Sequence, residues 1–392
     1  MSNRFLHLLN LDTVGGVEEL FMHFLAHSTT ISSAQHHLLI TGPKPHPFFQ
    51  GRLNSLSASQ TLEKYAYGIK IPKPLRSLKR KQALLTSQPH ITVLWNRIEA
   101  IKKIQSRSKI VYYEHGASWI APKSDRHNAF FSEVDQLLVN SFAAKRVVEL
   151  KWNVRAPITI VHNPLKPTMI AAAEPKQPVD TSKRPFVIGF IGRLIPLKGV
   201  PLLLHALHHL VKWQIPVTCL IAGDGPSKPA LEKEIKRLNL TNHVSFLGCI
   251  QDVSSFYDKI DALVIPSIRE PLGLVAQEAA LHGCPVIASY VDGLPEVVHN
   301  EQTGFTIPQT LDITHYSQFG GENTSLPDLV YDPSSDTLRE PKLVNPATLA
   351  EKLLMLIQDP ERYVSYSKQA ILSAKLRPTF RQYAEELIKI LG

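Results

Sequence analysis

Short, continuous apolar runs recur along the chain, and a turn and then a helical apolar pattern follow most of them. The first half holds such runs at 5–10, 37–41, 91–94, 110–113, 135–140 and 158–161. The second half holds them at 186–191, 217–222, 244–247, 262–265 and 286–288. Runs of this length are typical of buried parallel strands that alternate with helices. The pattern predicts an α/β protein with two doubly wound parallel sheets.

Two stretches interrupt this alternation. Residues 166–185 are rich in Pro, Ala and charged residues, which indicates a linker between a first domain at 1–165 and a second at 186–375. Residues 309–345 contain Gly, Pro, Ser and Asp throughout and show no helical period. A loop of this length is usually functional or disordered. We expect an irregular insertion there that covers an acceptor, mediates assembly or is passive, and we favour the first.

Composition places the chain among globular proteins. Its 392 residues are 44% hydrophobic and 20% charged. The longest apolar runs fall far short of the roughly 20 residues of a membrane span. The first residues lack the small-residue cleavage site of a signal peptide. Three widely spaced cysteines are expected to be reduced core residues of a cytoplasmic protein: Cys219, Cys249 and Cys284.

Positive charge is concentrated in the first half of the chain. Residues 1–165 contain 21 Lys and Arg against 10 Asp and Glu, whereas the rest contains 22 against 24. The densest cluster comprises Lys70, Lys73, Arg76, Lys79, Arg80 and Lys81. It is either a solvated helix face or a peripheral contact with an anionic membrane on the cytoplasmic side. The sequence shows no recognition helix, zinc motif or aromatic RNA-binding motif, so nucleic acid is not expected as a partner.

Two carboxylates mark the most informative stretch, which runs from 264 to 298. Glu270 follows an apolar run, and Glu278 comes eight residues later. Pro271 suits the first position of a helix and Gly283 its end, which places Glu278 two turns into that helix. Eight helical residues span about 12 Å, whereas the acid and base of a glycosidase lie about 5–9.5 Å apart. The carboxylates therefore resemble two contacts to one elongated ligand.

Two motifs in the first half lie where predicted strands end. Gly15 and Gly16 stand between a strand and a helix, where the backbone can approach a ligand closely. A tight turn explains the glycine pair equally well. His115 follows the strand at 110–113, at the carboxyl edge where parallel sheets bind ligands. The pairs His23/His27 and His205/His209 lack a third ligand, so no metal site is expected.

Six pieces in order resemble the retaining GT-B glycosyltransferases of family 4, also called glycosyl transferases group 1. They read GGVE, EHG, NP, GRLIPLKG, GDGP and EPLGLVAQE, and the densest part of the match spans 187–307. The resemblance implies two facing Rossmann-like domains with an interdomain cleft. It also implies a nucleotide-sugar bound mainly by the second domain, and a last helix, 376–392, that returns to the first.

The resemblance assigns roles to residues of this chain. It implies that Arg193 and Lys198 stabilise charge on the departing diphosphate, because cations placed there favour the transition state. Glu270 would orient the donor sugar and Glu278 would accept hydrogen bonds from the ribose. His115 would reach the sugar from the first domain, and Gly16 would allow close approach of the sugar-phosphate. The remaining donor-binding residues implied are Gly15, Gly223, Asp224, Gly248, Cys249, Ile250, Gly273 and Leu274.

The implied reaction is metal-independent transfer of a hexose with retention. The chain has no Asp-x-Asp triplet to bridge a metal to the diphosphate. A UDP-sugar such as UDP-GlcNAc or UDP-Glc is the favoured donor, and a lipid-linked or lipopolysaccharide/polysaccharide glycan of the bacterial envelope the favoured acceptor. Alternatives are a GDP-mannose-dependent mannosyltransferase, a sugar phosphorylase, a nucleotide-sugar epimerase and an inactive sugar-binding module. Two positions depart from the family pattern: Asp292-Gly293 replaces a glycine pair, and Leu272 an aromatic residue.

Overall fold

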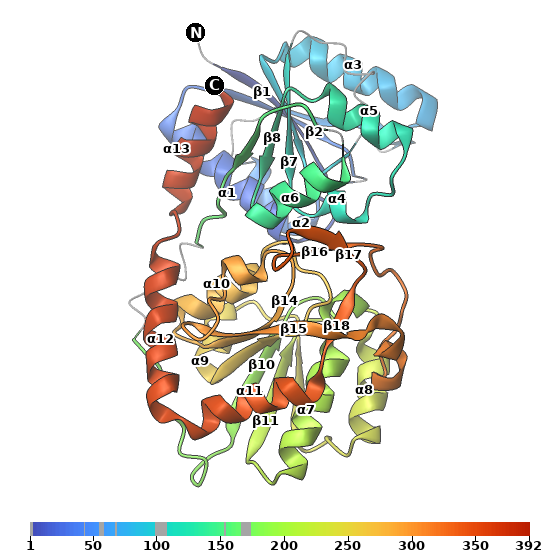
Figure 1. Cartoon of the computed structure of the whole chain (residues 1–392). Coiled ribbons are helices and arrows are strands. Elements are labelled where there is room, and N and C mark those ends of the chain that lie inside the picture. The colour runs from blue at the N-terminus through green and yellow to red at the C-terminus, as the bar shows by residue number, and fades with distance from the viewer. Residues whose placement is uncertain are drawn as a thin grey trace. The chain divides into compact units, whose positions relative to one another are not determined.

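The computed structural model describes residues 3–42, 44–54, 59–66, 69–98, 108–152, 154–165 and 174–392, without the side chains of Asn54 and Lys73. The chain divides into two compact units. Unit 1 comprises Met1–Pro164 together with Pro378–Gly392, and unit 2 comprises Leu165–Arg377. Each unit contains one seven-stranded sheet with helices on its faces (Figure 1).

Unit 1 is built on a sheet whose strands all run parallel, in the order β3-β2-β1-β6-β7-β8-β9. These strands are β1 Arg4–Leu9, β2 Gln35–Ile40, β3 Ser59–Leu62, β6 Ile91–Trp95, β7 Lys109–Glu114, β8 Gln136–Val139 and β9 Ile158–Ile160. A small hairpin adds β4 Tyr65–Ala66 and β5 Ile69–Lys70. The helices are α1 Gly16–Ile31, α2 Pro47–Asn54, η1 Lys73–Leu75, α3 Arg76–Ser87, α4 Ala117–Ile120, α5 Asp125–Glu133 and α6 Phe142–Lys151.

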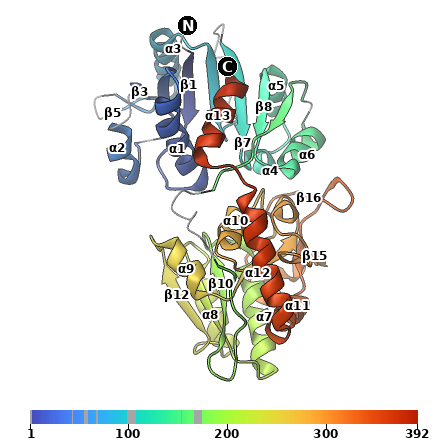
Figure 2. The same ribbon diagram turned by 90° about the vertical axis from the view of Figure 1, so that its left-hand side faces the viewer.

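The C-terminal helix α13, Phe380–Leu391, completes the core of unit 1. It lies beside α1 in both views (Figures 1 and 2) and buries Tyr383 and Leu387 in the same apolar cluster as Phe21. A capping box at Thr379 starts the helix, because its side chain and that of Gln382 satisfy each other's backbone N–H groups. The last residues of the chain therefore belong to the first unit.

Unit 2 repeats the architecture in the order β12-β11-β10-β13-β14-β15-β18, with only β18 antiparallel to its neighbour. Its strands are β10 Phe186–Ile191, β11 Val217–Ala222, β12 Val244–Gly248, β13 Ala262–Ile265, β14 Val286–Tyr290, β15 Gly304–Asp312 and β18 Lys342–Val344. Its helices are η4 Pro196–Lys198, α7 Val200–Lys212, α8 Lys228–Arg237, α9 Val253–Lys259, α10 Leu274–Leu281, η5 Leu294–Glu296, α11 Pro346–Gln358 and α12 Pro360–Lys375. Figure 2 shows α12 running past α10.

The segment 309–345, expected to be irregular, is ordered and integrated into unit 2. β15 continues to Asp312 and pairs there with β18, and η6, Ile313–Phe319, follows. A hairpin of β16, Val330–Asp332, and β17, Thr337–Arg339, completes the segment. The expectation was wrong because strands of three residues are too short to show a period in the sequence. Tyr316, in η6, is fully buried and anchors the segment to the core.

Residues 166–173 of the expected linker lie outside the described residues. The described remainder, 174–185, packs on unit 2. The backbone N–H of Lys176 donates to Ser367 Oγ at 2.8 Å, and Arg184 forms a two-pronged ion pair with Asp261 at 2.7 and 2.8 Å. Hydrogen bonds and an ion pair therefore hold this part of the linker on unit 2.

Candidate nucleotide-sugar site

The order of strands in unit 2 defines where a ligand can bind. From β10 the chain proceeds to β11 and β12 on one side, whereas β13 lies on the other. Loops after β10 and β13 therefore diverge at a topological switch point, which is the usual ligand crevice of open α/β sheets. Arg193 and Lys198 follow β10, and Glu270 follows β13. The sequence motifs thus meet at one edge of one sheet.

A close approach of two backbones fixes the loop that carries the two cations. Gly199 has φ +66°, and a Cβ there would lie 2.0 Å from the carbonyl oxygen of Pro266. Any other residue would push the β10 loop away from the β13 loop. The N–H of Ile268 also donates to the carbonyl of Leu197 at 2.8 Å. The two loops are therefore joined directly by backbone contacts.

The loop after β11 packs against the same cation loop. Gly223 has φ +122°, and a Cβ there would meet the carbonyl oxygen of Gly192 at 2.0 Å. Asp224 is exposed, and its side chain accepts from the N–H of Gly225 at 2.8 Å. Next to it, the carbonyl of Gly248 at the end of β12 accepts from the N–H of Gly223 at 2.7 Å. Three consecutive strands thus end in one connected set of loops.

Cys249 follows Gly248 and is exposed, so its expected place in the core was wrong. Its loop position explains the exposure, since β12 has ended one residue earlier. Ile250 beside it is partly buried. The other two cysteines are buried as expected, and burial raises the pKa of the Cys219 and Cys284 thiols to about 12. Only Cys249 therefore offers its side chain to the site edge.

Lys198 and Glu270 form an ion pair across the switch point. Lys198 Nζ lies 2.5 Å from Glu270 Oε2, and the side chains are 25% and 12% exposed. Ser267 Oγ is 3.5 Å from the same carboxylate oxygen. Arg193 is exposed, and among the described residues it forms no ion pair. The site therefore presents one paired and one available cation beside a mostly buried carboxylate.

Helix α10 begins later than the sequence predicted. Pro271 lies in the loop, and the helix starts at Leu274 after Gly273, whose φ of +89° turns the chain into the helix. Glu278 is therefore about one turn into α10, not two. Its Oε2 accepts a hydrogen bond from Tyr257 Oη at 2.9 Å, and Tyr257 is fully buried on α9. Sequence reasoning missed this partner, which orients the carboxylate expected to bind the ribose.

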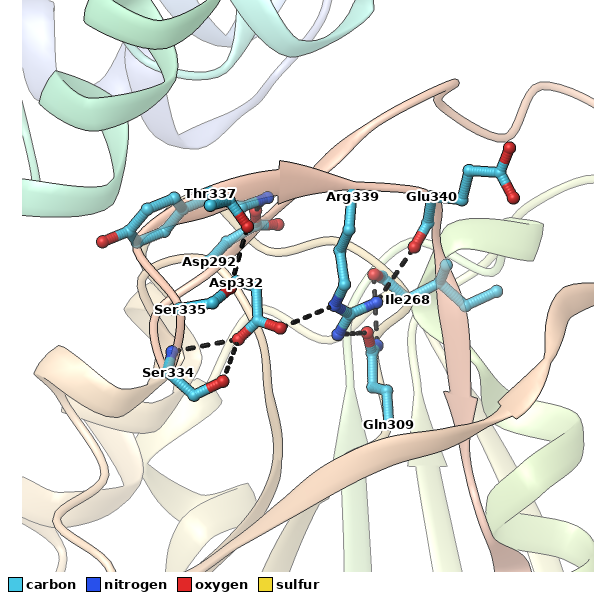
Figure 3. A network of polar contacts seen from close by, with 10 residues as sticks. Ile268, Asp292, Gln309, Asp332, Ser334, Ser335, Thr337, Arg339 and Glu340 are labelled. Atoms are coloured by element: carbon cyan, nitrogen blue, oxygen red, sulfur yellow. Dashed lines mark hydrogen bonds and ion pairs between the residues drawn. The ribbon is translucent and has the colours of Figure 1, made fainter.

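Further polar residues that the sequence did not single out form hydrogen bonds to the backbone of the Glu270 loop. Asp292, 1% exposed, accepts from the N–H of Glu270 at 2.9 Å and from the N–H of Tyr331 at 2.8 Å. Gln309 donates to backbone carbonyls that precede Glu270 in the same loop, and Arg339 of the β16–β17 hairpin donates to Gln309 (Figure 3). Asp292 was noted only as a departure from the family pattern. Its position at the end of β14 was the available signal.

Unit 1 has its own switch point, between β1 and β6, and a pocket of about 250 Å³ lies there. The lining includes Asn10, Glu18, Asn96 and Arg97, and also Leu9, Val17, Phe21 and Trp95. Gly16 starts α1, and Gly15 precedes it in an extended conformation. Burial raises the pKa of Glu18. Asn10 and Asn96 directly follow strand ends, so the rule that singled out His115 could have found both.

His115 is held by neighbouring strand ends of unit 1. Its N–H donates to Asn96 Oδ1 at 2.9 Å, and its ring lies 4.2 Å from the Tyr113 ring centroid to centroid. Its Nδ1 is 3.5 Å from Asn140 Nδ2, and its Nε2 is buried without a partner among the described residues. Burial lowers the pKa of His115 to about 3. The imidazole is therefore neutral near pH 7.

Within the described residues, no three His, Cys, Asp or Glu side chains converge to hold a metal ion. His23 and His27 instead pack against Phe380 of α13, and His205 bonds Glu234 at 2.7 Å. None of the helices described combines the length and apolar character needed to cross a bilayer. The paired histidines of the sequence thus serve packing and local hydrogen bonding.

Comparison with known proteins agrees with this geometry. The family described as "Glycosyl transferases group 1" matches residues 173–318. A D-inositol 3-phosphate glycosyltransferase of Streptomyces bingchenggensis is 38% identical over 130 residues, which are 30% of this chain and 29% of that protein. One of Mycobacteroides abscessus is 32% identical over 185 residues, 45% and 41% of the two chains. The chain thus matches less than half the length of these relatives.

Solved structures extend the similarity to the whole chain. Anabaena HepE in complex with UDP superposes with a TM-score of 0.72 at 20% identity, covering 99% of each chain. Sucrose-phosphate synthase of Thermosynechococcus elongatus gives a TM-score of 0.72 at 16% identity, covering 99% of this chain and 98% of that one. At such identities the likeness shows the fold. The chain has the GT-B fold, and its residues 173–318 match the glycosyl transferases group 1 family.

Proposed function

We propose that the protein is a retaining, metal-independent hexosyltransferase that uses a UDP-sugar, with UDP-GlcNAc or UDP-Glc as the favoured donors. The observation that carries the proposal is the convergence of Arg193, Lys198, Glu270 and Glu278 on neighbouring loops and one helix at the switch point of unit 2. The acceptor is a hydroxyl of a lipid-linked or lipopolysaccharide/polysaccharide glycan. A GDP-mannose donor is the alternative at the same site.

The charges of this site suit a leaving nucleoside diphosphate. When the bond from the anomeric carbon to the β-phosphate oxygen breaks, negative charge grows on that phosphate. Arg193 and Lys198 are placed to stabilise this charge, and the N–H groups at the start of α10 add donors from Gly273 and Leu274. Glu278, oriented by Tyr257, accepts hydrogen bonds from the ribose hydroxyls. The loops that carry Gly223, Asp224, Gly248, Cys249 and Ile250 surround the base.

In the proposed reaction the acceptor oxygen forms a new bond to the anomeric carbon on the face that the phosphate leaves. The acceptor's proton passes to an oxygen of the departing β-phosphate. Glu270 orients the sugar ring through its hydroxyls, and Lys198 holds Glu270 in place. His115, neutral at physiological pH, serves as a hydrogen-bond partner to the sugar and not as a cation. Gly15 and Gly16 leave room for the acceptor at the unit 1 pocket.

Several similar proteins support the choice of donor and acceptor class. The solved structure of HepE is a complex with UDP. Curated relatives are named D-inositol 3-phosphate glycosyltransferases. A solved structure with a TM-score of 0.68 is a lipopolysaccharide outer core galactosyltransferase. These proteins make a uridine nucleotide the first donor to test and a hydroxyl-rich acceptor the first acceptor class.

A thermal-shift experiment tests the proposal. The protein is heated with UDP, GDP or ADP, and then with UDP-Glc, UDP-GlcNAc or GDP-mannose. At about 100 times its dissociation constant a ligand stabilises by about 2.7 kcal/mol, which for a unit of this size raises the melting temperature by about 5–10 °C. We expect this shift with UDP and its loss in Glu278→Ala. The matched control is Glu232→Ala, an exposed carboxylate on α8.

Indifference to all six nucleotides would sink the transferase proposal. The other enzyme classes give different results once a donor binds. Sugar transfer to inorganic phosphate identifies a phosphorylase, and sugar-nucleotide cleavage without any acceptor identifies an epimerase. Binding of a nucleotide-sugar with no turnover under any condition identifies an inactive sugar-binding module.

A peripheral membrane contact through α3 is a second proposal. Four apolar side chains are exposed near the exposed basic residues Lys70 and Lys81: Ile69, Leu75, Leu78 and Leu85. Such interleaving of apolar and basic side chains suits an anionic leaflet, at about 1 kcal/mol per basic residue. Arg80 does not contribute, because its guanidinium lies 2.8 Å from Glu63 and is mostly buried. Co-sedimentation with vesicles containing phosphatidylserine should be lost in Leu78→Ser/Lys81→Glu; equal binding to neutral vesicles would contradict the proposal.

A further inference from the structure

We propose that the 309–345 segment is a positioning frame for the two loops that contact the diphosphate and the donor sugar. This inference rests on the proposed function of the site. The frame has two arms, one that reaches the Arg193–Lys198 loop and one that reaches the Glu270 loop. Its residues hold other residues in place and do not themselves touch the donor.

The first arm is Tyr316 in η6. Its ring is fully buried, and its hydroxyl donates to the carbonyl of Pro196 at 2.7 Å. Pro196 lies between Arg193 and Lys198 in the sequence and starts η4. The same carbonyl also accepts from the N–H of Gly199 at 3.1 Å, so the Tyr316 hydroxyl is the donor from outside the turn. Tyr316 therefore sets the position of the turn that carries both cations.

The second arm runs from Arg339, at the end of β17, through Gln309. Arg339 Nη2 donates to Gln309 Oε1 at 3.0 Å, while its other nitrogens bond Asp332 at 3.1 Å and the carbonyl of Glu340 at 3.0 Å. Gln309 Nε2 then donates to the carbonyls of Ser267 and Ile268 at 3.1 and 3.2 Å. Figure 3 shows this chain of contacts from the hairpin to the loop.

The chemistry of this arm leaves little freedom. Gln309 is 6% exposed, and both of its N–H donors and its oxygen are engaged. Because Arg339 fixes the amide oxygen, the NH₂ group must point at the two carbonyls. The planar guanidinium makes three directed contacts at once, which a lysine cannot reproduce. The hairpin therefore determines where the backbone of Ser267 and Ile268 lies.

A backbone bridge carries the same hairpin to Glu270 itself. Asp292 accepts from the N–H of Tyr331 in β16 through Oδ1 and from the N–H of Glu270 through Oδ2. The N–H of Asp292 donates back to the Tyr331 carbonyl at 3.1 Å, and the N–H of Gly293 donates to the Glu270 carbonyl at 3.1 Å. Both ends of the Glu270 loop are thus bonded to groups that the hairpin positions.

Amide hydrogen exchange followed by mass spectrometry tests the frame. It needs no ligand, so its result does not depend on whether the proposed function is correct. In Arg339→Lys and Gln309→Glu, we expect exchange in peptides covering 266–272 to accelerate at least fivefold. In Tyr316→Phe, the accelerated peptides should instead cover 193–199. The matched control is Ser335→Ala on the same hairpin; among the described residues its hydroxyl bonds Thr337 Oγ1, at 2.8 Å, and neither loop.

Calorimetric titration with UDP supplies the functional readout. Tyr316→Phe should weaken UDP binding about fivefold, because the cation loop shifts, whereas Arg339→Lys should stay within twofold. Faster exchange throughout unit 2 in any variant would show general destabilisation and overturn the positioning role. Unchanged exchange in both loops would also overturn it. A wild-type protein that does not bind UDP contradicts the proposed function and leaves the exchange result to decide the frame.

Discussion

The two units place different polar groups beside the central strands of their sheets. At the switch point of unit 2, Arg193 is exposed and the Lys198–Glu270 pair remains partly open to water. In unit 1 a chain of buried groups lies beside the middle of β1 and the start of β2, and burial lowers the pKa values of His7 and His36 there. Trp95 Nε1 donates to His7 Nδ1 at 3.2 Å, His7 Nε2 meets His36 Nδ1 at 2.9 Å, and His36 Nε2 meets Ser28 Oγ at 2.8 Å.

One strand plan therefore carries exposed charge in unit 2 and buried imidazoles in unit 1. A charge that stays near water costs little desolvation and can be offered to a diphosphate, so unit 2 keeps its cations on exposed loops. Buried imidazoles avoid that cost by staying uncharged, and burial lowers the pKa of His36 to about 4. Under the proposed function, the exposed cations of unit 2 are the groups that bind the charged donor.

Removing a cation from unit 2 should give the largest effect. For Lys198→Ala we expect turnover with the matching nucleotide-sugar to fall by about 10²–10³, because a preorganised charge at the leaving group is lost. Steady-state rates of UDP release measure it. Lys233→Ala, an exposed lysine on α8, is the control and should keep wild-type rates. A loss below threefold in Lys198→Ala would show that the exposed charges of unit 2 do not serve the reaction.

Acid should lower the stability of unit 1 through its buried histidines. His7, His36 and His37 all have lowered pKa values in the folded protein because of burial. The unfolded chain takes up protons below pH 6.5 before the folded chain does, so stability is complete above pH 6.5 and falls as the pH approaches 4. His36 alone should cost about 2 kcal/mol between pH 7.5 and 5.

Tryptophan fluorescence during urea unfolding reports this loss for unit 1. Trp95, Trp119 and Trp152 are buried in unit 1, whereas Trp213 of unit 2 is 42% exposed. The unfolding midpoint should fall at pH 5, and His36→Asn should show a smaller pH dependence despite a lower midpoint at pH 7.5. A midpoint that does not move between the two pH values would mean that the histidines are not buried as neutral groups.

The same contrast explains how much the sequence could predict. Strands such as β10 and β13 were predictable because each is a continuous apolar run that ends at a glycine- or proline-bearing loop. Residues at those ends, such as Arg193 and Glu270, follow from the strand rule. Asn10 and Asn96 obey the same rule in unit 1 and were passed over, because an asparagine after a strand also reads as a turn.

Partners that join distant segments could not be predicted. Asp292 contacts Glu270 across 22 residues, and Gln309 contacts Ser267 across 42. Nothing local in the sequence encodes such pairs. The start of α10 was misplaced for a different reason. Pro271 favours a helix start, but the left-handed Gly273 places the start after itself. The preference of Pro271 for a helix start was overridden by the close packing of Gly273 against Leu294.

The last prediction concerns Tyr257, a buried neutral donor that supports Glu278 in the unit 2 site. Tyr257→Phe removes the 2.9 Å hydrogen bond to Glu278 and keeps the buried ring. One hydrogen bond to a charged group contributes about 1.5 kcal/mol, so UDP affinity should fall about tenfold or less. Calorimetry measures it, and Tyr363→Phe, whose hydroxyl bonds the Asp261 carbonyl at 2.9 Å, is the control. Equal losses in both variants would mean that the hydroxyl stabilises the fold alone, and Glu278 would then be oriented by the helix itself.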